Sequence, residues 1–91
     1  MEKMTEVRRA FIGKHFSRFD SWCGSHDYIK VKDIKKRKNK TYELTGKNAF
    51  GSDVALYVDD NVIEALIKEG KKKDSGEIDH CIVSVEYEIC E

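Results

Sequence analysis

The chain has 91 residues, of which 40% are hydrophobic and 37% are charged, and its formal net charge is zero. A chain of this length supports one hydrophobic core, so we expect a single domain over residues 1–91. No apolar run approaches the roughly 18 residues that cross a bilayer, and the amino terminus lacks the apolar stretch of a signal peptide. The sequence therefore predicts a cytoplasmic protein without membrane contact, whose three cysteines are reduced thiols.

The first predicted element is a helix over residues 3–20. Apolar residues recur there at steps of three and four, which is the period of an amphipathic helix. A turn that contains Gly24 follows, because glycine readily adopts the left-handed conformation that ends a helix. The aromatic residues of the helix and the turn are predicted to lie in the core: Phe11, Phe16, Phe19 and Trp22.

Three strands are predicted next, as an antiparallel meander. Apolar residues alternate with polar ones in Tyr28–Ile34 and Thr41–Thr45, and Val54–Val58 is the third strand. The residues between the first two strands are predicted to form the tip of a hairpin. The segment from Gly46 to Ser52 has the glycine spacing of a phosphate-binding loop. A strand follows it instead of the helix that such a loop requires, so we interpret it as a turn.

A second helix is predicted to begin at Asp60 or Asn61, either of which can cap its exposed backbone N–H groups, and to end at Gly70. The segment Lys71–Gly76 is interpreted as a solvated linker, and Cys81–Ile89 alternates apolar and polar residues as a strand.

The resulting order α-β-β-β-α-β predicts an α+β fold. We expect a four-stranded, mainly antiparallel sheet with two helices packed on one face. The last strand is long and free of proline. We therefore expect it at an edge of the sheet, where it can pair with a second copy to form a homodimer.

The net charge of zero conceals two oppositely charged segments. Between residues 30 and 40 seven basic residues face a single acid, Asp33, whereas residues 74–91 contain six acids and no lysine or arginine. The basic hairpin is the strongest candidate site, with Tyr42 as a stacking ring and Phe50 as either a core residue or an exposed anchor. The candidate binding residues are Lys30, Lys32, Lys35, Lys36, Arg37, Lys38, Lys40, Tyr42 and Phe50.

Other combinations of residues favour neither metal binding nor catalysis. Cys23 and His26 have a spacing suitable for zinc, but His80 and Cys81 are adjacent in a predicted strand and would point to opposite faces. No cysteine–histidine or carboxylate pair is placed in a cleft by the predicted elements. We therefore expect no enzymatic activity, no cofactor and no metal.

Two classes of function remain. The sequence favours a small protein-binding modulator, an inhibitor or adaptor, that presents the basic hairpin tip and an acidic edge strand to a larger protein. A short, proline-free, lysine-rich chain also favours an accessory protein of a phage or other mobile element, many of which inhibit a host factor. The alternative is a nucleic-acid-binding module that contacts phosphates through the basic hairpin. The net charge of zero argues against this alternative.

Overall fold

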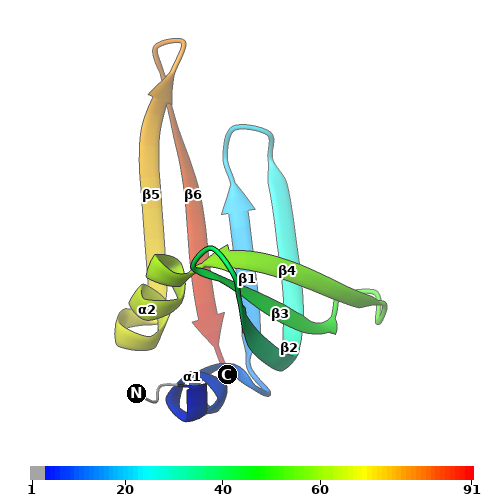
Figure 1. Ribbon diagram of the computed structural model, residues 1–91. Coiled ribbons are helices and arrows are strands. Elements are labelled where there is room, and N and C mark those ends of the chain that lie inside the picture. Colours follow the sequence, from blue (N-terminus) through cyan, green and yellow to red (C-terminus); the bar gives the residue numbers. More distant parts are fainter. Residues whose placement is uncertain (1–3) are drawn as a thin grey trace.

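A computed structural model describes residues 4–91 and shows two helices and a six-stranded antiparallel sheet in that range (Figure 1). The elements in chain order are α1 (Met4–Phe11), β1 (His15–Asp20), β2 (Ser25–Arg37), β3 (Thr41–Lys47), β4 (Asp53–Asp59), α2 (Asp60–Glu69), β5 (Lys71–Ile78) and β6 (Cys81–Cys90). The strand order is β4-β3-β2-β1-β6-β5. The predicted α+β class with an antiparallel sheet is confirmed, and the predicted number of four strands is wrong.

The first helix is shorter than the sequence predicts. Helix α1 spans eight residues, Gly13 reverses the chain at a φ of 84°, and residues 15–20 form strand β1 instead of helix. Neighbouring residues of a strand point to opposite faces. Phe16 is therefore fully buried while Phe19 is exposed, and Trp22 is exposed in the following turn. The prediction that Phe19 and Trp22 belong to the core is wrong.

The segment predicted to be a linker is an edge strand. Strand β5 pairs antiparallel with β6 along its whole length, and the two strands are joined by Asp79 and His80, whose φ values are both positive. Strand β6 lies between β1 and β5. The predicted edge position of the last strand is therefore wrong, and both edges of β6 are already occupied by β1 and β5.

Helix α2 lies where the sequence predicts it and begins at Asp60, but its capping residue differs from the prediction. Its N-cap is Asp59, not Asp60 or Asn61, and the Asp59 side chain makes no capping hydrogen bond. The helix ends as expected at Gly70, which adopts a φ of 81° and donates its N–H to the carbonyl of Leu66 at 2.8 Å. A left-handed residue at this position satisfies a carbonyl group of the last turn.

The sheet is strongly bent, and α2 lies between its two edges. The register of β2 against β3 shifts between Val31 and Asp33, and such a bulge increases bending and twist. The second half of β2 with β3 and β4 consequently crosses the direction of β1, β6 and β5 (Figure 1). Helix α2 contacts β4 at one end of the strand order and β5 at the other.

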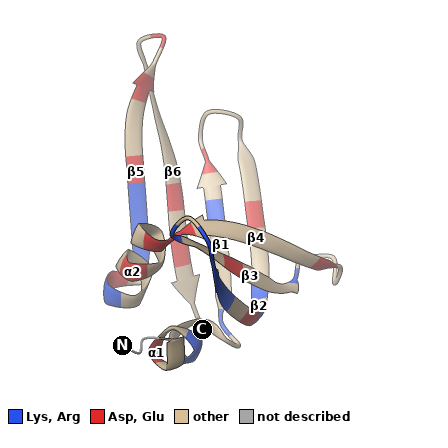
Figure 2. Cartoon of the chain, viewed as in Figure 1, with Lys and Arg blue, Asp and Glu red and all other residues tan. Residues whose placement is uncertain are grey.

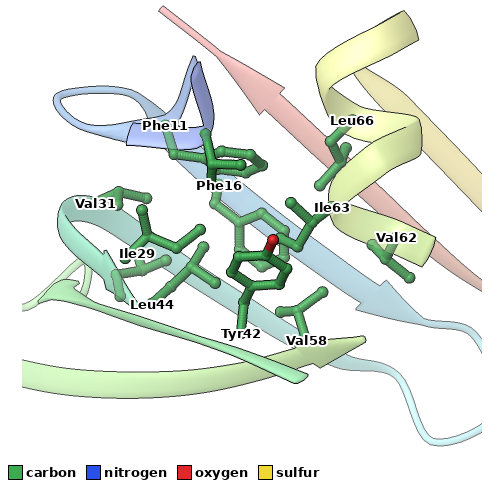
Figure 3. Close-up of a cluster of buried hydrophobic side chains, with 12 residues drawn as sticks. Phe11, Phe16, Ile29, Val31, Tyr42, Leu44, Val58, Val62, Ile63 and Leu66 are labelled. Atoms are coloured by element: carbon green, nitrogen blue, oxygen red, sulfur yellow. The ribbon is translucent and has the colours of Figure 1, made fainter. Parts of the chain in front are cut away.

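One hydrophobic core lies between the bent sheet and the helices (Figure 3). Its buried members are Val7, Phe11, Phe16, Ile29, Val31, Ile34, Tyr42, Leu44, Val58, Val62, Ile63 and Leu66. Strands β5 and β6 contribute no buried residue, and only Tyr87 and Ile89 of β6 pack against this cluster. Much of the β5–β6 hairpin therefore lies outside the core.

Candidate functional site

Two hairpins extend beyond the core and join into one sheet whose faces are both exposed (Figure 1). No residue is buried in 17–28, at the end of the β1–β2 hairpin, or in 73–86, at the end of the β5–β6 hairpin. The backbone N–H of Ser21 donates to the carbonyl of Ser84 at 2.9 Å, and the N–H of Ser84 donates to the Ser21 hydroxyl at 2.8 Å. We call these two segments together the projecting sheet.

Exposed apolar side chains are concentrated on the projecting sheet. Seven large hydrophobic side chains are exposed within residues 4–91, and four of them lie there: Phe19, Trp22, Ile78 and Ile82. Ile82 is 78% exposed. Phe19 is opposite Glu86, which shares a strand face with Ile82, so Phe19 and Ile82 lie on the same face of the sheet. Ile78 is opposite Cys81 on the other face.

A sheet of this kind ordinarily requires a covered apolar face. Isolated hairpins are marginally stable in water, and a sheet gains its stability by packing one face on other elements. Exposed apolar side chains that gather on one part of a surface are candidates for contact with a macromolecule. The projecting sheet carries four of the seven exposed large hydrophobic side chains of residues 4–91 and is such a candidate.

The acidic residues of β6 do not form an isolated negative patch. Lys71 lies opposite Glu88 and Lys73 lies opposite Glu86, where Lys73 Nζ is 3.8 Å from Glu86 Oε2. Lysines of β5 and acids of β6 thus run beside each other (Figure 2). Residues 74–91 contain six acids and no lysine or arginine, but the strand predicted to be a linker brings positive charge next to this acidic segment.

An ion pair lies on the opposite face of the projecting sheet. Arg18 of β1 and Asp27 of β2 are directly opposite each other, and Arg18 Nη2 donates to Asp27 Oδ2 at 2.5 Å. Tyr87 is opposite Arg18 on the other neighbouring strand. Burial raises the pKa of the Tyr87 hydroxyl, and the nearby negative charge of Asp74 raises it further. This face therefore combines charged groups with half-buried apolar ones.

A hollow of about 560 Å³ lies over β1, β6 and β5. Its lining includes the rings of Phe19 and His26, which meet edge to face at 6.1 Å, together with Lys71, Lys73 and Glu86. Residues 4–91 contain no group of three or more histidine, cysteine or acidic residues placed to hold a metal ion. In the same range, no helix is long and apolar enough to cross a membrane.

The predicted basic residues are spread along β2 and do not form a single patch. Lys30 lies opposite Lys47, at the end of β3 next to the β3–β4 loop, whereas Arg37 lies opposite Thr41 at the other end. Seven residues of extended strand span about 20 Å, and successive side chains point to opposite faces. Lys32 lies at the bulge of β2. The basic residues therefore divide between the two ends of the hairpin.

The basic tip, which we define as residues 36–40, has acidic and aromatic neighbours. Only Lys38, Asn39 and Lys40 form the turn itself. Arg37 Nε lies 3.1 Å from Glu43 Oε1, which offsets part of the positive charge. The backbone N–H of Asp60 donates to the carbonyl of Lys40 at 2.8 Å and attaches the tip to the start of α2.

The aromatic ring exposed at the basic tip is not the predicted one. Tyr42 belongs to the core, and Lys36 Nζ lies 5.2 Å from the centre of its ring, so Tyr42 is not free for stacking. Tyr57 of β4 is 57% exposed. It lines an open hollow of about 790 Å³ with residues of the tip, among them Arg37 and Lys38. The exposure of Tyr57 could have been predicted from the strand pattern of Val54–Val58, because Tyr57 points to the face opposite its buried neighbour Val58.

Phe50 is separate from the basic tip. It lies in the β3–β4 loop, at the opposite end of β3, and is 92% exposed. The Asn48 side-chain oxygen accepts hydrogen bonds from the backbone N–H groups of Phe50 and Ser52, each at 2.9 Å. Of the two roles considered for Phe50, core residue or exposed anchor, this exposure is compatible with the anchor only.

The acid nearest the β3–β4 loop is paired with a lysine. Lys47 Nζ lies 2.9 Å from Asp53 Oδ1 and, by this hydrogen bond and its charge, lowers the pKa of the Asp53 carboxyl. The charge of Lys32 has the same effect to a smaller extent. Lys47 and Lys32 therefore have an acidic neighbour within the protein.

The chain resembles none of the known proteins with which it was compared. No protein-family model, no curated protein and no solved structure matches it.

Proposed function

We propose that this domain is a non-enzymatic protein-binding modulator, an inhibitor or adaptor, that binds a larger protein through the projecting sheet. The observation that supports this proposal is a sheet whose two faces both lie open while Phe19, Trp22 and Ile82 are exposed on it. Complete burial of one large apolar side chain contributes about 1.5–3 kcal/mol. A partner that covers these side chains therefore gains part of its binding free energy from them, and exposed aromatic residues are frequent anchors of protein interfaces.

The charged residues give such an interface direction and selectivity. The pair Lys73–Glu86 lies on the same face as Phe19 and Ile82, so a partner on that face needs charges that complement this pair. The basic tip adds attraction at longer range toward an acidic protein surface. Action in the cytoplasm and an origin in a phage or other mobile element belong to the same proposal.

A capture experiment with matched variants tests this function. The immobilised domain is exposed to lysate of the cells that naturally contain it, and the retained proteins are identified and quantified. We expect Phe19→Ser combined with Ile82→Ser to lower the retained amount of a specific protein at least tenfold. Phe50→Ser removes a more exposed ring outside the projecting sheet, so it should leave that amount unchanged. Equal retention by the double variant and the wild type would refute the proposal.

A second candidate function is single-stranded nucleic-acid binding, which is favoured by the position of Tyr57 in the open hollow beside the basic tip. Basic side chains neutralise phosphates, and an exposed ring stacks on a base with a contribution of about 1–3 kcal/mol. Fluorescence anisotropy with single-stranded DNA and RNA at 50 mM and 200 mM salt tests it. A true site loses affinity steeply with salt and on Tyr57→Ala. Absence of binding at 50 mM salt eliminates this candidate.

A further inference from the structure

The outer edge of β5 has no neighbouring strand within the described chain. Strand β5 ends the strand order and pairs only with β6, in a continuous register from Lys71 to Ile78. It contains no proline and no bulge, and all its residues except Lys72 are exposed. A regular, unprotected edge of this length is a template for another strand.

The backbone groups that face outward follow from the β5–β6 turn. Ile78 and Cys81 flank a two-residue turn, and the residues that flank such a turn exchange both backbone hydrogen bonds. Hydrogen-bonded pairs alternate with non-bonded pairs along an antiparallel ladder. Lys73, Ser75 and Glu77 therefore direct their N–H and C=O groups away from β6, toward the open edge.

Two copies of β5 that run antiparallel to each other have complementary charges. Its first three residues are lysines, and its acids, Asp74 and Glu77, follow them. When two copies of the strand run in opposite directions, the basic end of one lies beside the acidic end of the other. Opposite charges across a strand pair are stabilising, and like charges are destabilising.

Symmetry limits the possible registers, and the charges favour the one centred on Ser75. A two-fold axis requires one residue to lie opposite its own copy. With Ser75 on the axis, Lys73 of each copy lies opposite Glu77 of the other, and all three residues share the sheet face away from Asp74. With Asp74 on the axis, two carboxylates would be directly opposite each other. The register centred on Ser75 therefore makes two attractive pairs and no repulsive one among these residues.

The other edge strand lacks this complementarity. Strand β4 begins at Asp53 and ends at Asp59, so antiparallel pairing of two copies about its centre at Leu56 would place these aspartates opposite each other. Helix α2 also begins directly after β4. The charge pattern thus distinguishes β5 from β4.

We propose that β5 pairs antiparallel with β5 of a second copy, with Ser75 on the two-fold axis, and that the sheet of one copy continues into the other. This homodimer leaves Phe19, Trp22 and Ile82 free, because none of them lies on β5, so it does not depend on the proposed protein-binding function. The experiment below uses the isolated domain, and its result is therefore independent of any partner.

Analytical ultracentrifugation between 10 and 500 µM provides the test. We expect the mass of the wild type to rise from 10.5 kDa toward twice that value as concentration increases. Lys73→Glu and Glu77→Lys each turn both cross-strand pairs into like-charge pairs, so each variant alone should dissociate about tenfold more readily or more. An equimolar mixture of the two variants restores opposite charges in both pairs, so it should dimerise like the wild type.

Lys47→Glu is the matched control, because it makes the same change of charge on β3, away from this edge, and should leave dimerisation unchanged. Far-ultraviolet circular dichroism verifies that each variant is folded, which we expect because exposed charges contribute little to stability. A wild type that stays at 10.5 kDa up to 500 µM overturns the proposal. Single variants that dimerise like the wild type, or a mixture that dimerises no better than either variant alone, also overturn it.

Discussion

Gly46→Ala is expected to lower the free energy of unfolding by about 3 kcal/mol or more, at the upper end of the cost of overpacking. Gly46 lies in β3 opposite Val31, where β2 begins its bulge. A Cβ atom at this position would lie 1.9 Å from the carbonyl oxygen of Lys30 and 2.9 Å from its carbonyl carbon. These are backbone atoms of a paired strand, so the contact is relieved only by moving β2 away from β3.

Gly76→Ala is the matched control for this prediction. Gly76 also lies within a strand, β5, but a Cβ atom there has no neighbour within 4 Å. Alanine restricts the unfolded chain more than glycine does, so Gly76→Ala should be neutral or stabilising by up to about 1 kcal/mol. Urea unfolding followed by circular dichroism measures both variants. Similar losses for Gly46→Ala and Gly76→Ala would contradict the described approach of β3 to β2.

Phe16→Ala is expected to lower the free energy of unfolding by about 3–5 kcal/mol, as is usual when a buried phenylalanine is truncated. Phe16 is fully buried on β1, lies opposite Ile29 on one side and Ile89 on the other, and has its ring 6.5 Å from that of Tyr87. The substitution opens a cavity at a position where two neighbouring strands meet the core.

Phe19→Ala is the control for the second prediction, and it also distinguishes a strand from a helix at residues 15–20. Phe19 lies on the opposite face of β1 and is 41% exposed, so its loss should stay below about 1.5 kcal/mol, the cost of partial apolar burial. A helix over residues 3–20 would place both rings in the core. Thermal and urea unfolding of the two variants provide the measurement, and equal losses would favour the helix.

The parts of the fold with a clear apolar period could be predicted from sequence. Strand β3 buries alternate residues, β4 and the second half of β6 shield alternate residues at least partly, and α2 buries Val62, Ile63 and Leu66 on one face. Residues 15–20 were misassigned because Phe16 and Phe19 are three residues apart, a spacing that fits one face of a helix. In β1 the same spacing separates the two faces of a strand.

Strand β5 could not be recognised from its own residues. It has a polar or charged residue at nearly every position because both of its faces are exposed, and only its pairing with β6 makes it a strand. The turn at Asp79 and His80 requires positive φ values at two residues that are not glycine. The usual glycine signal of a two-residue hairpin is therefore missing.

The candidate site was predictable only in part. The position of Lys38 and Lys40 at a hairpin turn followed from the flanking strands. The projecting sheet could not be predicted, since it depends on contacts such as that between Ser21 and Ser84, which are 63 residues apart. The neutralisation of β6 by Lys73 has the same origin, because it results from tertiary pairing.

The most direct test of binding by the projecting sheet is amide hydrogen exchange. The exchange rates of the isolated domain are compared with those of its complex with the captured protein. Exchange reports local opening and covering residue by residue. We expect slower exchange in the complex at residues 19–26 and 80–86, from both hairpins, with little change at residues 36–40. Slowing confined to residues 36–40, or no slowing in either hairpin, would contradict it.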